Sequence, residues 1–464
     1  MRGIEGALFA MQSAREGRFI GETLRSLGDK MPVAELSLAS SLAYGALRRE
    51  ALWKKIFSGY VSPTKDKNQQ KTQSTQASQN SQKTREIDPI VSDCLLLGTA
   101  GMLELRHFAT AALVNGLLEA LKTKGYGKAV PMVNAILRSI DRDRPAILEK
   151  FSRAPRLEDK ALWAGIPEWT LPAWKKSWNN EELNEIFGSM NTPPCASLRT
   201  PPQKREDVMR ILSANGIDGV HSDLFPDSIR LPSTISPTLV PGFDKGLVTV
   251  QTESSMLAAS LVSVFWRKFG GAGGKILDMC SGRGIKAGQI AQSLPDASIE
   301  CWELSPGRHR AAAREMARLG IGGRAVLRLG DALSLSPHEK PSVILLDAPC
   351  SGSGTWNRKP ESKWALSWPR LDKMAELQKN LLRKALTLVR PGGIIIYVTC
   401  SLLRQENENV VADALSGTAD CVVLDAPLDG SYVRRGRPWG TYILPGLPWL
   451  DGFYVSVITK RTGA

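Results

Sequence analysis

Apolar residues in the first third of the chain recur at helical spacing. Up to about residue 155 they fall every three or four positions, which is typical of amphipathic helices, most clearly in 34–49, 93–103 and 131–138. One stretch breaks this pattern: residues 64–84 are rich in Lys, Gln, Ser, Thr and Asn and contain no aromatic side chain, so they cannot bury a core. We therefore predict an all-α domain over 1–155 with a disordered insert at about 62–87.

A mixed pattern follows between residues 156 and 245. Short apolar runs at 196–200 and 228–231 predict strands, and the spacing of 202–215 predicts a helix that ends at Gly216. This alternation of short elements indicates a small α+β module.

From about residue 246 the chain alternates strongly apolar strands with amphipathic helices, which predicts a parallel sheet covered by helices. The predicted strands are 275–279, 298–304, 325–329, 343–346 and 394–398, with two late ones at 422–424 and 453–459. The predicted helices are 285–293, 307–319, 371–389 and 404–415. Five parallel strands and a terminal pair predict a mixed seven-stranded, Rossmann-like sheet in an α/β domain over 246–464.

Composition narrows the class of protein. The formal net charge is +14, and a basic excess of this size favours a polyanionic partner such as nucleic acid. The chain has no apolar run of membrane-spanning length, and its start does not have the pattern of a secretory signal. Seven scattered cysteines indicate a reducing, cytoplasmic setting, and without any Cys-x-x-Cys pair we predict no metal site.

A glycine-containing turn follows the first strand of the α/β domain. Gly282, Gly284 and Gly288 lie between this strand and the next helix, where free backbone N–H groups can meet a nucleotide ligand. The turn alone is a weak signal, but acids follow at the next two strand ends, Glu303 for ribose hydroxyls and Asp331 for an adenine amine. S-adenosylmethionine fits this series better than a nicotinamide dinucleotide, because no group suited to hydride transfer follows.

Two cysteines stand at the exits of predicted strands, Cys350 after the fourth and Cys400 after the fifth. Helix N-termini and basic neighbours, of which Arg358, Lys359 and Lys363 are examples, favour a thiolate at such positions. A thiolate can add to carbon 6 of a pyrimidine and make carbon 5 nucleophilic enough to accept a methyl group. Asp347 can hydrogen-bond the cytosine and stabilise the adduct. These residues alone do not decide which thiol attacks.

The other cysteines in predicted helices and strands are interpreted as small buried hydrophobic residues. This applies to Cys94, Cys195, Cys301 and Cys421. Trp356 and Trp364 can stack on bases, although a place in the core is the better interpretation for at least one of them.

Two motifs give the chain a family resemblance, residues 347–354 (DAPCSGSG) and 399–401 (TCS). With support from 133–138, 363–364 and 406–409, the chain resembles the Sun family of RNA (cytosine-5) methyltransferases, most closely the bacterial small-subunit rRNA methyltransferase B type. This resemblance implies a NusB-like N-terminal domain, 16S rRNA as the substrate and S-adenosylmethionine as the cofactor. It also implies that Cys400 is the nucleophile and that Cys350 aids product release.

The cofactor loop departs from the pattern of that family at two positions, because Arg283 stands for a proline and Ile285 for a glycine. Lys286 remains and is expected to meet the methionine carboxylate. The residues expected to bind the cofactor are Asp278, Cys280, Ser281, Gly282, Arg283, Gly284, Ile285, Lys286, Glu303, Asp331 and Asp347.

The expected protein is therefore a cytoplasmic, monomeric enzyme that binds RNA, with no membrane or metal partner. One alternative keeps the chemistry but takes tRNA or 23S rRNA as the substrate. Another is a non-catalytic, RNA-binding ribosome assembly factor that has lost cofactor binding through the altered loop. A nicotinamide-dependent oxidoreductase is the most distant alternative.

Overall fold

The computed structural model describes residues 2–28, 30–61, 87–105, 109–231, 239–270, 274–446 and 449–462. The insert predicted at about 62–87 lies almost wholly outside the described residues. The chain divides into two compact units, one of Met1–Glu168 with Lys359–Glu361 and one of Trp169–Arg358 with Ser362–Ala464. Among the described residues, none of the helices combines the length and the apolar character needed to cross a bilayer.

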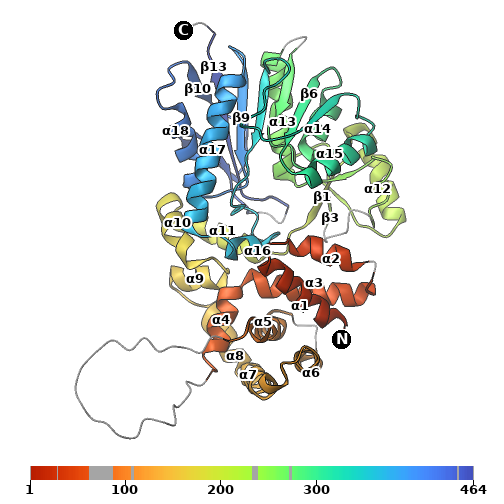
Figure 1. Cartoon of the computed structure of the whole chain (residues 1–464), viewed down its shortest axis with the longest axis vertical. Helices are drawn as coiled ribbons and strands as arrows, with labels where there is room; N and C mark the ends of the chain where they lie inside the picture. Colours follow the sequence, from red (N-terminus) through yellow and green to blue (C-terminus); the bar gives the residue numbers. More distant parts are fainter. Residues whose placement is uncertain are drawn as a thin grey trace, which may run out of the picture. The chain divides into compact units, whose positions relative to one another are not determined.

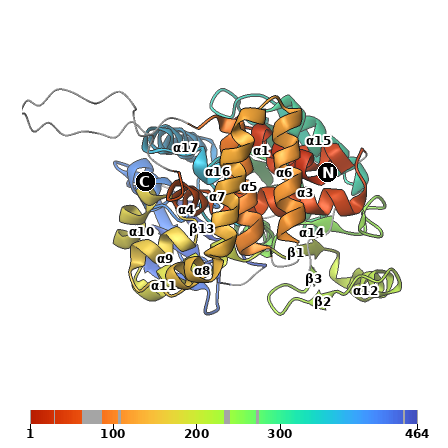
Figure 2. The same ribbon diagram turned by 90° about the horizontal axis from the view of Figure 1, so that it is seen from below.

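The first unit is helical (Figure 1). Its helices are α1 (Arg2–Arg15), α2 (Ile20–Gly28), α3 (Val33–Arg48), α4 (Glu50–Ser58), α5 (Pro89–Glu104), α6 (Thr110–Thr123), α7 (Val130–Arg142), α8 (Arg144–Ser152) and α9 (Leu157–Trp163). Helix α5 packs against α1, α3, α4, α6 and α7 (Figure 2). It is buried at nearly every position between Val91 and Leu103, because a helix enclosed by other helices needs apolar residues on all sides. Asp88 starts it by accepting a hydrogen bond from the Ile90 N–H at 2.9 Å.

The second unit opens with two helices and a small antiparallel sheet. Its elements are α10 (Leu171–Ser177), α11 (Asn180–Asn191), β1 (Ala196–Arg199), α12 (Arg205–Ala214), β2 (Val220–His221), β3 (Ser228–Leu231) and β4 (Thr249–Val250). The strand order is β2-β3-β1-β4, and α12 packs Val208 and Leu212 against Leu198 and Ile229 of the sheet. The predicted strands and helix are confirmed, whereas the two-residue strands β2 and β4 are too short to show a period in the sequence.

A nine-stranded sheet forms the rest of the second unit. Its strands are β5 (Lys275–Asp278), β6 (Ser298–Glu303), β7 (Ala325–Leu329), β8 (Val343–Asp347), β9 (Ile394–Thr399), β10 (Cys421–Leu424), β11 (Val433–Arg437), β12 (Gly440–Ile443) and β13 (Phe453–Lys460). They follow the order β11-β12-β13-β9-β8-β5-β6-β7, with β10 paired to β13. The strands from β9 to β7 are parallel and the others antiparallel, which confirms the predicted mixed sheet.

Helices cover this sheet on its two faces (Figure 1). They are α13 (Glu253–Phe265), α14 (Ile285–Ser293), α15 (Pro306–Arg318), α17 (Trp368–Leu388) and α18 (Glu408–Leu415), and the short helix α16 (Pro360–Trp364) precedes α17 in the chain. Helix α13 packs with α14 and against β8 and β9, and α17 packs with α18 and against the same two strands. The central strands are thus buried on both sides, which is why residues 394–398 form one continuous apolar run.

The predicted number of strands is too small by two. The hairpin of β11 and β12 was missed because residues 433–437 (VRRGR) show no alternation of apolar and polar residues, and the register of the pair shifts between Arg434 and Arg437. The last predicted helix, 404–415, is interrupted. A 3-10 turn over Arg404–Glu406 ends at Asn407, whose φ of −119° and ψ of −102° are not helical, and α18 begins after it.

Candidate active site

Three neighbouring parallel strands bring the cofactor loop and the two cysteine motifs to one edge of the sheet. In the register of the sheet, Asp278 of β5 lies opposite Leu345 of β8, and Asp347 of β8 lies opposite Val398 of β9. The carboxyl ends of β5, β8 and β9 therefore coincide, where open α/β sheets bind their ligands. The places of these motifs at the ends of predicted parallel strands are consistent with this juxtaposition, while the order of the strands comes from the structure.

The thiols of Cys350 and Cys400 lie side by side, with 3.2 Å between their sulfur atoms, and neither cysteine forms a disulfide. The hydrogen bond to Cys400 and burial together raise the pKa of Cys350 well above its ordinary value. The prediction that basic neighbours favour a thiolate is therefore wrong for Cys350. For Arg358 the structure explains why this basic neighbour does not favour the thiolate: its guanidinium binds Asp451 at 2.5 Å and the carbonyl of Cys195 at 3.0 Å.

A buried carboxylate, that of Glu406, joins the two cysteine loops. It accepts hydrogen bonds from the backbone N–H of Ser351 at 2.7 Å, from the Ser351 hydroxyl, and from the Ser401 hydroxyl at 2.5 Å. The amide of Gln378 donates a further bond at 3.1 Å. Ser351 and Ser401 directly follow Cys350 and Cys400, so one side chain fixes the spacing of the two thiols. Burial raises the pKa of Glu406, while these donors oppose the shift.

Backbone contacts of Gly354 join the Cys350 loop to the Cys400 loop and to the segment that precedes β13. Gly354 donates its N–H to the carbonyl of Cys400 at 2.9 Å, and Gly452 donates to the carbonyl of Gly354 at 2.9 Å. A Cβ atom on Gly354 would collide with the carbonyl group of Gly452, and one on Gly452 would lie 2.8 Å from the Gly354 Cα. The close approach of these backbones explains the small residues in 351–354 and at 452.

The cofactor loop forms a tight turn between β5 and α14 in spite of its unusual residues. Gly284 has a φ of 77°, and a side chain there would press against Met316 and Ala312 of α15, so this position requires glycine. Ser281 fastens the loop to the next strand by donating its N–H and its hydroxyl to the carbonyl of Trp302.

The other predicted binding residues of the loop differ in their exposure. The side chain of Arg283 is exposed, and those of Cys280 and Ile285 are half-buried. Desolvation and the nearby acids, of which Asp278 is the first, raise the pKa of the Cys280 thiol well above its ordinary value. Cys280 therefore stays protonated and is not a candidate nucleophile.

Asp278, at the end of β5, is buried with both carboxylate oxygens lacking a hydrogen-bond partner among the described residues. Burial, with a contribution from Asp347, raises its pKa from 3.8 to about 7, although Lys286 and the nearby backbone of Cys280 oppose the shift. The ammonium of Lys286 binds Asp347 at 2.5 Å. A buried acceptor without a donor is unfavourable in the protein alone, and a ligand that donates a hydrogen bond to Asp278 would remove this cost.

The two further acids lie where the order of the strands places them, at the ends of β6 and β7. Glu303 is buried and accepts from the N–H of Ser305 at 2.7 Å and from Arg308 at 3.0 Å. Asp331 is exposed and accepts from the N–H of Leu333 at 3.0 Å. Since β5, β6 and β7 are adjacent, Asp278, Glu303 and Asp331 end successive strands of one edge.

The tryptophans considered for base stacking, and the cysteines interpreted as buried, differ in their exposure. Trp356 is fully buried and stacks on Trp174 at 5.6 Å, so it belongs to the core. Trp364 is half-exposed. Burial is confirmed for Cys94 and Cys301. It is wrong for Cys195 and Cys421, which are both partly exposed.

The sequence did not predict the buried hydrogen bonds that hold the two cysteine loops together. In the sequence, Glu406 belongs to the segment 406–409 that supports the family resemblance, and no pattern marks Gln378. Glu406 lies in a polar run between an apolar strand and a helix, a position that looks solvated in the sequence. Its burial becomes evident only when the loops after β8 and β9 are brought together.

Comparisons with known proteins match each part of the chain. A family model described as 16S rRNA methyltransferase RsmB/F matches residues 271–459. A ferredoxin-like domain model of the RsmF/B-like methyltransferases matches 166–237, and a NusB family model matches 67–142. These matches agree with the α/β domain, the small α+β module and the helical unit described above.

Two of the similar proteins match the chain over nearly its whole length, and a third matches about two thirds of it. The ribosomal RNA small subunit methyltransferase B of Klebsiella pneumoniae is 26% identical over 458 residues, which cover 97% of this chain and 96% of that protein. The crystal structure of PH0851 has a TM-score of 0.75 at 20% identity and covers 99% of this chain and 98% of its own. The structure of NSun6 from Pyrococcus horikoshii with SFG has a TM-score of 0.57 at 18% identity and covers 64% and 99%. The chain therefore matches, in this order, the models of a NusB domain, of a ferredoxin-like module and of the RsmB/F type of 16S rRNA methyltransferase.

Proposed function

We propose that this chain transfers a methyl group from S-adenosylmethionine to carbon 5 of a cytosine in 16S rRNA, through a covalent adduct on Cys400. The observation that carries the proposal is the pair of reduced thiols 3.2 Å apart at the ends of neighbouring parallel strands. A thiolate that adds to carbon 6 makes carbon 5 nucleophilic enough to take the methyl group from the sulfonium. A base then removes the proton at carbon 5, the bond between carbon 6 and sulfur breaks, and a second thiol beside the first can take part in this release. The match of residues 271–459 to the model of a 16S rRNA methyltransferase supports this class of reaction.

Cys400 is assigned the attack and Cys350 the release. Either sulfur atom can donate the hydrogen bond between the two thiols, and assigning the attack to Cys400 makes Cys350 the donor. A donor held against a thiolate stabilises the charged, nucleophilic form. The ammonium of Lys286 is also close. Burial lowers the pKa of Lys286, but Asp347 and, more weakly, Cys400 raise it above its ordinary value, so Lys286 is a cation that attracts negative charge at these two groups.

We assign Asp347 to bind the cytosine ring of the substrate. One of its oxygens binds Lys286, while about a third of its side chain is exposed. A carboxylate with an accessible oxygen beside the thiols can accept a hydrogen bond from the exocyclic amine of cytosine, or meet the ring nitrogen once that is protonated. This contact would hold carbon 6 of the base against the Cys400 sulfur.

The unpaired carboxylate of Asp278 fits S-adenosylmethionine, which carries an ammonium group and hydroxyls that can serve as donors. Around it, Lys286 is assigned to the methionine carboxylate, Glu303 to the ribose and Asp331 to the adenine, and the backbone of 280–286 completes the site. Bound S-adenosylmethionine would supply an electrophilic methyl carbon on a sulfonium. The protein residues bind and orient it beside the thiols.

The substrate class rests on charge and on access to the base. A formal net charge of +14 suits a polyanion, and contacts to phosphates would make binding weaken with salt. We assign these contacts to the helical unit and the α+β module. The face of a paired base is covered by its neighbours in the stack, so the target cytosine must be single-stranded or turned out of its helix.

Cysteine variants test the chemistry. With 16S rRNA and labelled S-adenosylmethionine, Cys400→Ala is expected to lose both methylation and adduct formation. Cys350→Ala is expected to accumulate a covalent protein–RNA complex that survives denaturing electrophoresis. Cys421→Ala, at a partly exposed thiol on β10, is the matched control and should behave as the wild type. A covalent complex formed by Cys400→Ala would reverse the assignment.

The substrate is tested separately. Methylated cytosines are mapped in the RNA of a deletion strain and its parent, and the expected result is the loss of one modification in 16S rRNA. A loss confined to tRNA or 23S rRNA would keep the chemistry and change the substrate. Calorimetry of the wild-type protein with S-adenosylmethionine tests the enzyme itself, since no binding would leave an assembly factor without catalysis.

A further inference from the structure

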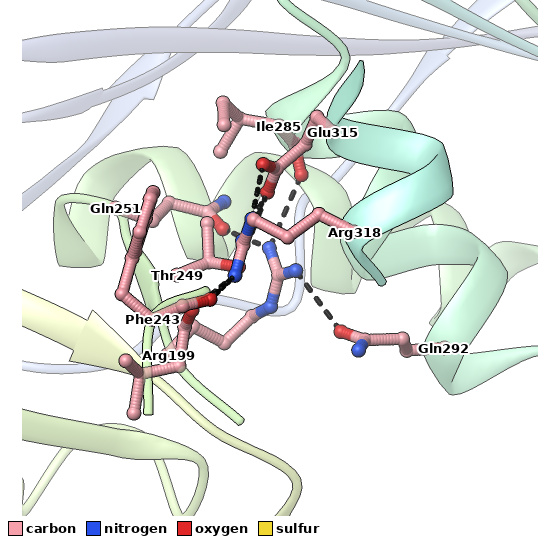
Figure 3. A network of polar contacts seen from close by, with 9 residues as sticks. Arg199, Phe243, Thr249, Gln251, Ile285, Gln292, Glu315 and Arg318 are labelled. Atoms are coloured by element: carbon pink, nitrogen blue, oxygen red, sulfur yellow. Dashed lines mark hydrogen bonds and ion pairs between the residues drawn. The ribbon is translucent and has the colours of Figure 1, made fainter. Parts of the chain in front are cut away.

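A buried arginine of the α+β module reaches the helix that begins at the cofactor loop (Figure 3). Arg199 is the last residue of β1, and only 3% of its surface is exposed. One guanidinium nitrogen, Nη1, donates to the carbonyl of Ile285 at 3.1 Å and to the side chain of Gln251, and Nη2 donates to Gln292 at 3.0 Å. Ile285 and Gln292 lie near the two ends of α14, so the guanidinium lies along that helix.

Gln251 extends this contact. It follows β4 of the module, and its amide donates to Gln289 in the middle of α14 at 2.7 Å. Gln289 in turn donates to the carbonyl of Met256 in α13 at 3.0 Å. Successive turns of α14 therefore hydrogen-bond, directly or through Gln251, to the side chain of Arg199, which lies outside the methyltransferase sheet.

The bonds of Arg199 go to amide and carbonyl oxygens, which are neutral acceptors. Burial lowers the pKa of Arg199 to about 10, so the side chain is still a cation at neutral pH. A buried cation is unfavourable unless its donors are satisfied in a fixed geometry. The guanidinium therefore holds its acceptors in one arrangement, and one of them is the backbone of residue 285 in the cofactor loop.

We propose that Arg199 is a positioning residue of the cofactor site: it fixes the first turn of α14, and with it the loop 282–286, so that cofactor affinity depends on the preceding α+β module. This inference rests on the proposed function, because it assumes that the loop binds S-adenosylmethionine. Arg199 acts through the backbone at Ile285 and need not touch the ligand.

A second arginine provides a matched control, since it joins the same two parts of the chain without binding α14. Arg318, at the end of α15, donates to the carbonyls of Phe243 and Val248, to the Thr249 hydroxyl at 2.8 Å, and to Glu315 (Figure 3). If Arg199 only held the module in place, the loss of either arginine would have the same consequences.

The experiment measures the dissociation constant for S-adenosylmethionine by calorimetry, together with the KM for the cofactor, kcat and the melting temperature of the full chain. Arg199→Met is expected to weaken cofactor binding about tenfold and raise the KM similarly, with kcat at saturating cofactor changed less than about twofold. Arg199→Lys, which keeps the charge and part of the bonding, should recover part of the affinity. Arg318→Met should lower the melting temperature and leave the dissociation constant unchanged.

Gln292→Met removes one acceptor of Arg199 on α14 and keeps the arginine itself, and it should weaken cofactor binding by a smaller factor even if Arg199→Met folds poorly. Unchanged affinity in both Arg199→Met and Gln292→Met would overturn the proposal, as would equal losses in Arg199→Met and Arg318→Met. A wild-type protein that binds no S-adenosylmethionine would instead overturn the proposed function, and the inference with it.

Discussion

Replacing Asp278 by asparagine should stabilise the protein without cofactor and weaken its binding of cofactor. Asp278 is buried, and neither of its carboxylate oxygens has a hydrogen-bond partner among the described residues. Burial raises its pKa from 3.8 to about 7, so the folded protein binds a proton at pH values where the unfolded chain has lost it. Stability must then fall as the pH rises from about 4 to about 7. Asparagine has a similar shape and cannot ionise.

The magnitude follows from the difference between the two pKa values. Between 3.8 and about 7 the loss of stability amounts to about 4 kcal/mol. The pH dependence is a sharper test than the absolute change, because any difference in packing between Asn and protonated Asp cancels. From pH 5 to pH 8, the advantage of Asp278→Asn should grow by about 2.5 kcal/mol, or about 5–10 °C in melting temperature for a unit of this size.

The assay is thermal unfolding of both proteins without cofactor at pH 5, 6, 7 and 8, followed by calorimetry with S-adenosylmethionine at pH 8. The pair of proteins at pH 5 is the internal control, because Asp278 is protonated there in the folded state and differs from Asn mainly in packing. The difference in melting temperature should widen with pH and level off above about 7. A difference that is constant across this range would refute the raised pKa. Unchanged cofactor affinity would refute the assignment of Asp278 to the ligand.

Two further substitutions test the bracing of the thiols. Glu406→Ala leaves buried donors of Ser351 and Ser401 unpaired, so it should lower the free energy of unfolding by about 2–4 kcal/mol and reduce adduct formation. Glu406→Gln should lower the free energy of unfolding by less. An unchanged melting temperature and unchanged adduct formation in Glu406→Ala would contradict this role. Gly354→Ala should cost about 1–3 kcal/mol or more by forcing the loop away from Gly452, as measured by thermal unfolding. Gly188→Ala in α11 is its control, because a Cβ there meets nothing within 4 Å, and an equal loss of stability would refute the steric argument.

The sequence predicted the parts of the fold that depend on short-range periodicity. The run 394–398 had to be a strand buried on both faces, and Cys400 therefore had to stand at its end. Because parallel strands end at the same edge, Asp278, Asp347 and the two cysteines could be placed together before any distance was known. The hairpin of β11 and β12 could not be predicted, since its stability comes from pairing with β13 rather than from a pattern of its own.

Interactions between distant residues account for most of what the sequence did not predict. Arg358 looked like a cation that could favour a thiolate, but its partner Asp451 lies 93 residues further along the chain. Glu406 looked solvated, although it is buried between two loops that come from different strands. In both cases the type of residue was informative, and its effect on the chemistry depended on a partner that only the folded chain reveals.

The two unusual residues of the cofactor loop matter less in the folded chain than their departure from the family pattern suggests. Arg283 and Ile285 replace the proline and the glycine of the family pattern, a departure that predicts a weakened loop. In the folded chain the turn is set by Gly284, whose φ of 77° and contact with α15 admit no side chain, and that glycine is retained. The side chain of Arg283 is exposed, and the contact of Ile285 with Arg199 is made by its backbone carbonyl. Positions that act through their backbone tolerate a change of side chain, so these departures are compatible with a working cofactor site.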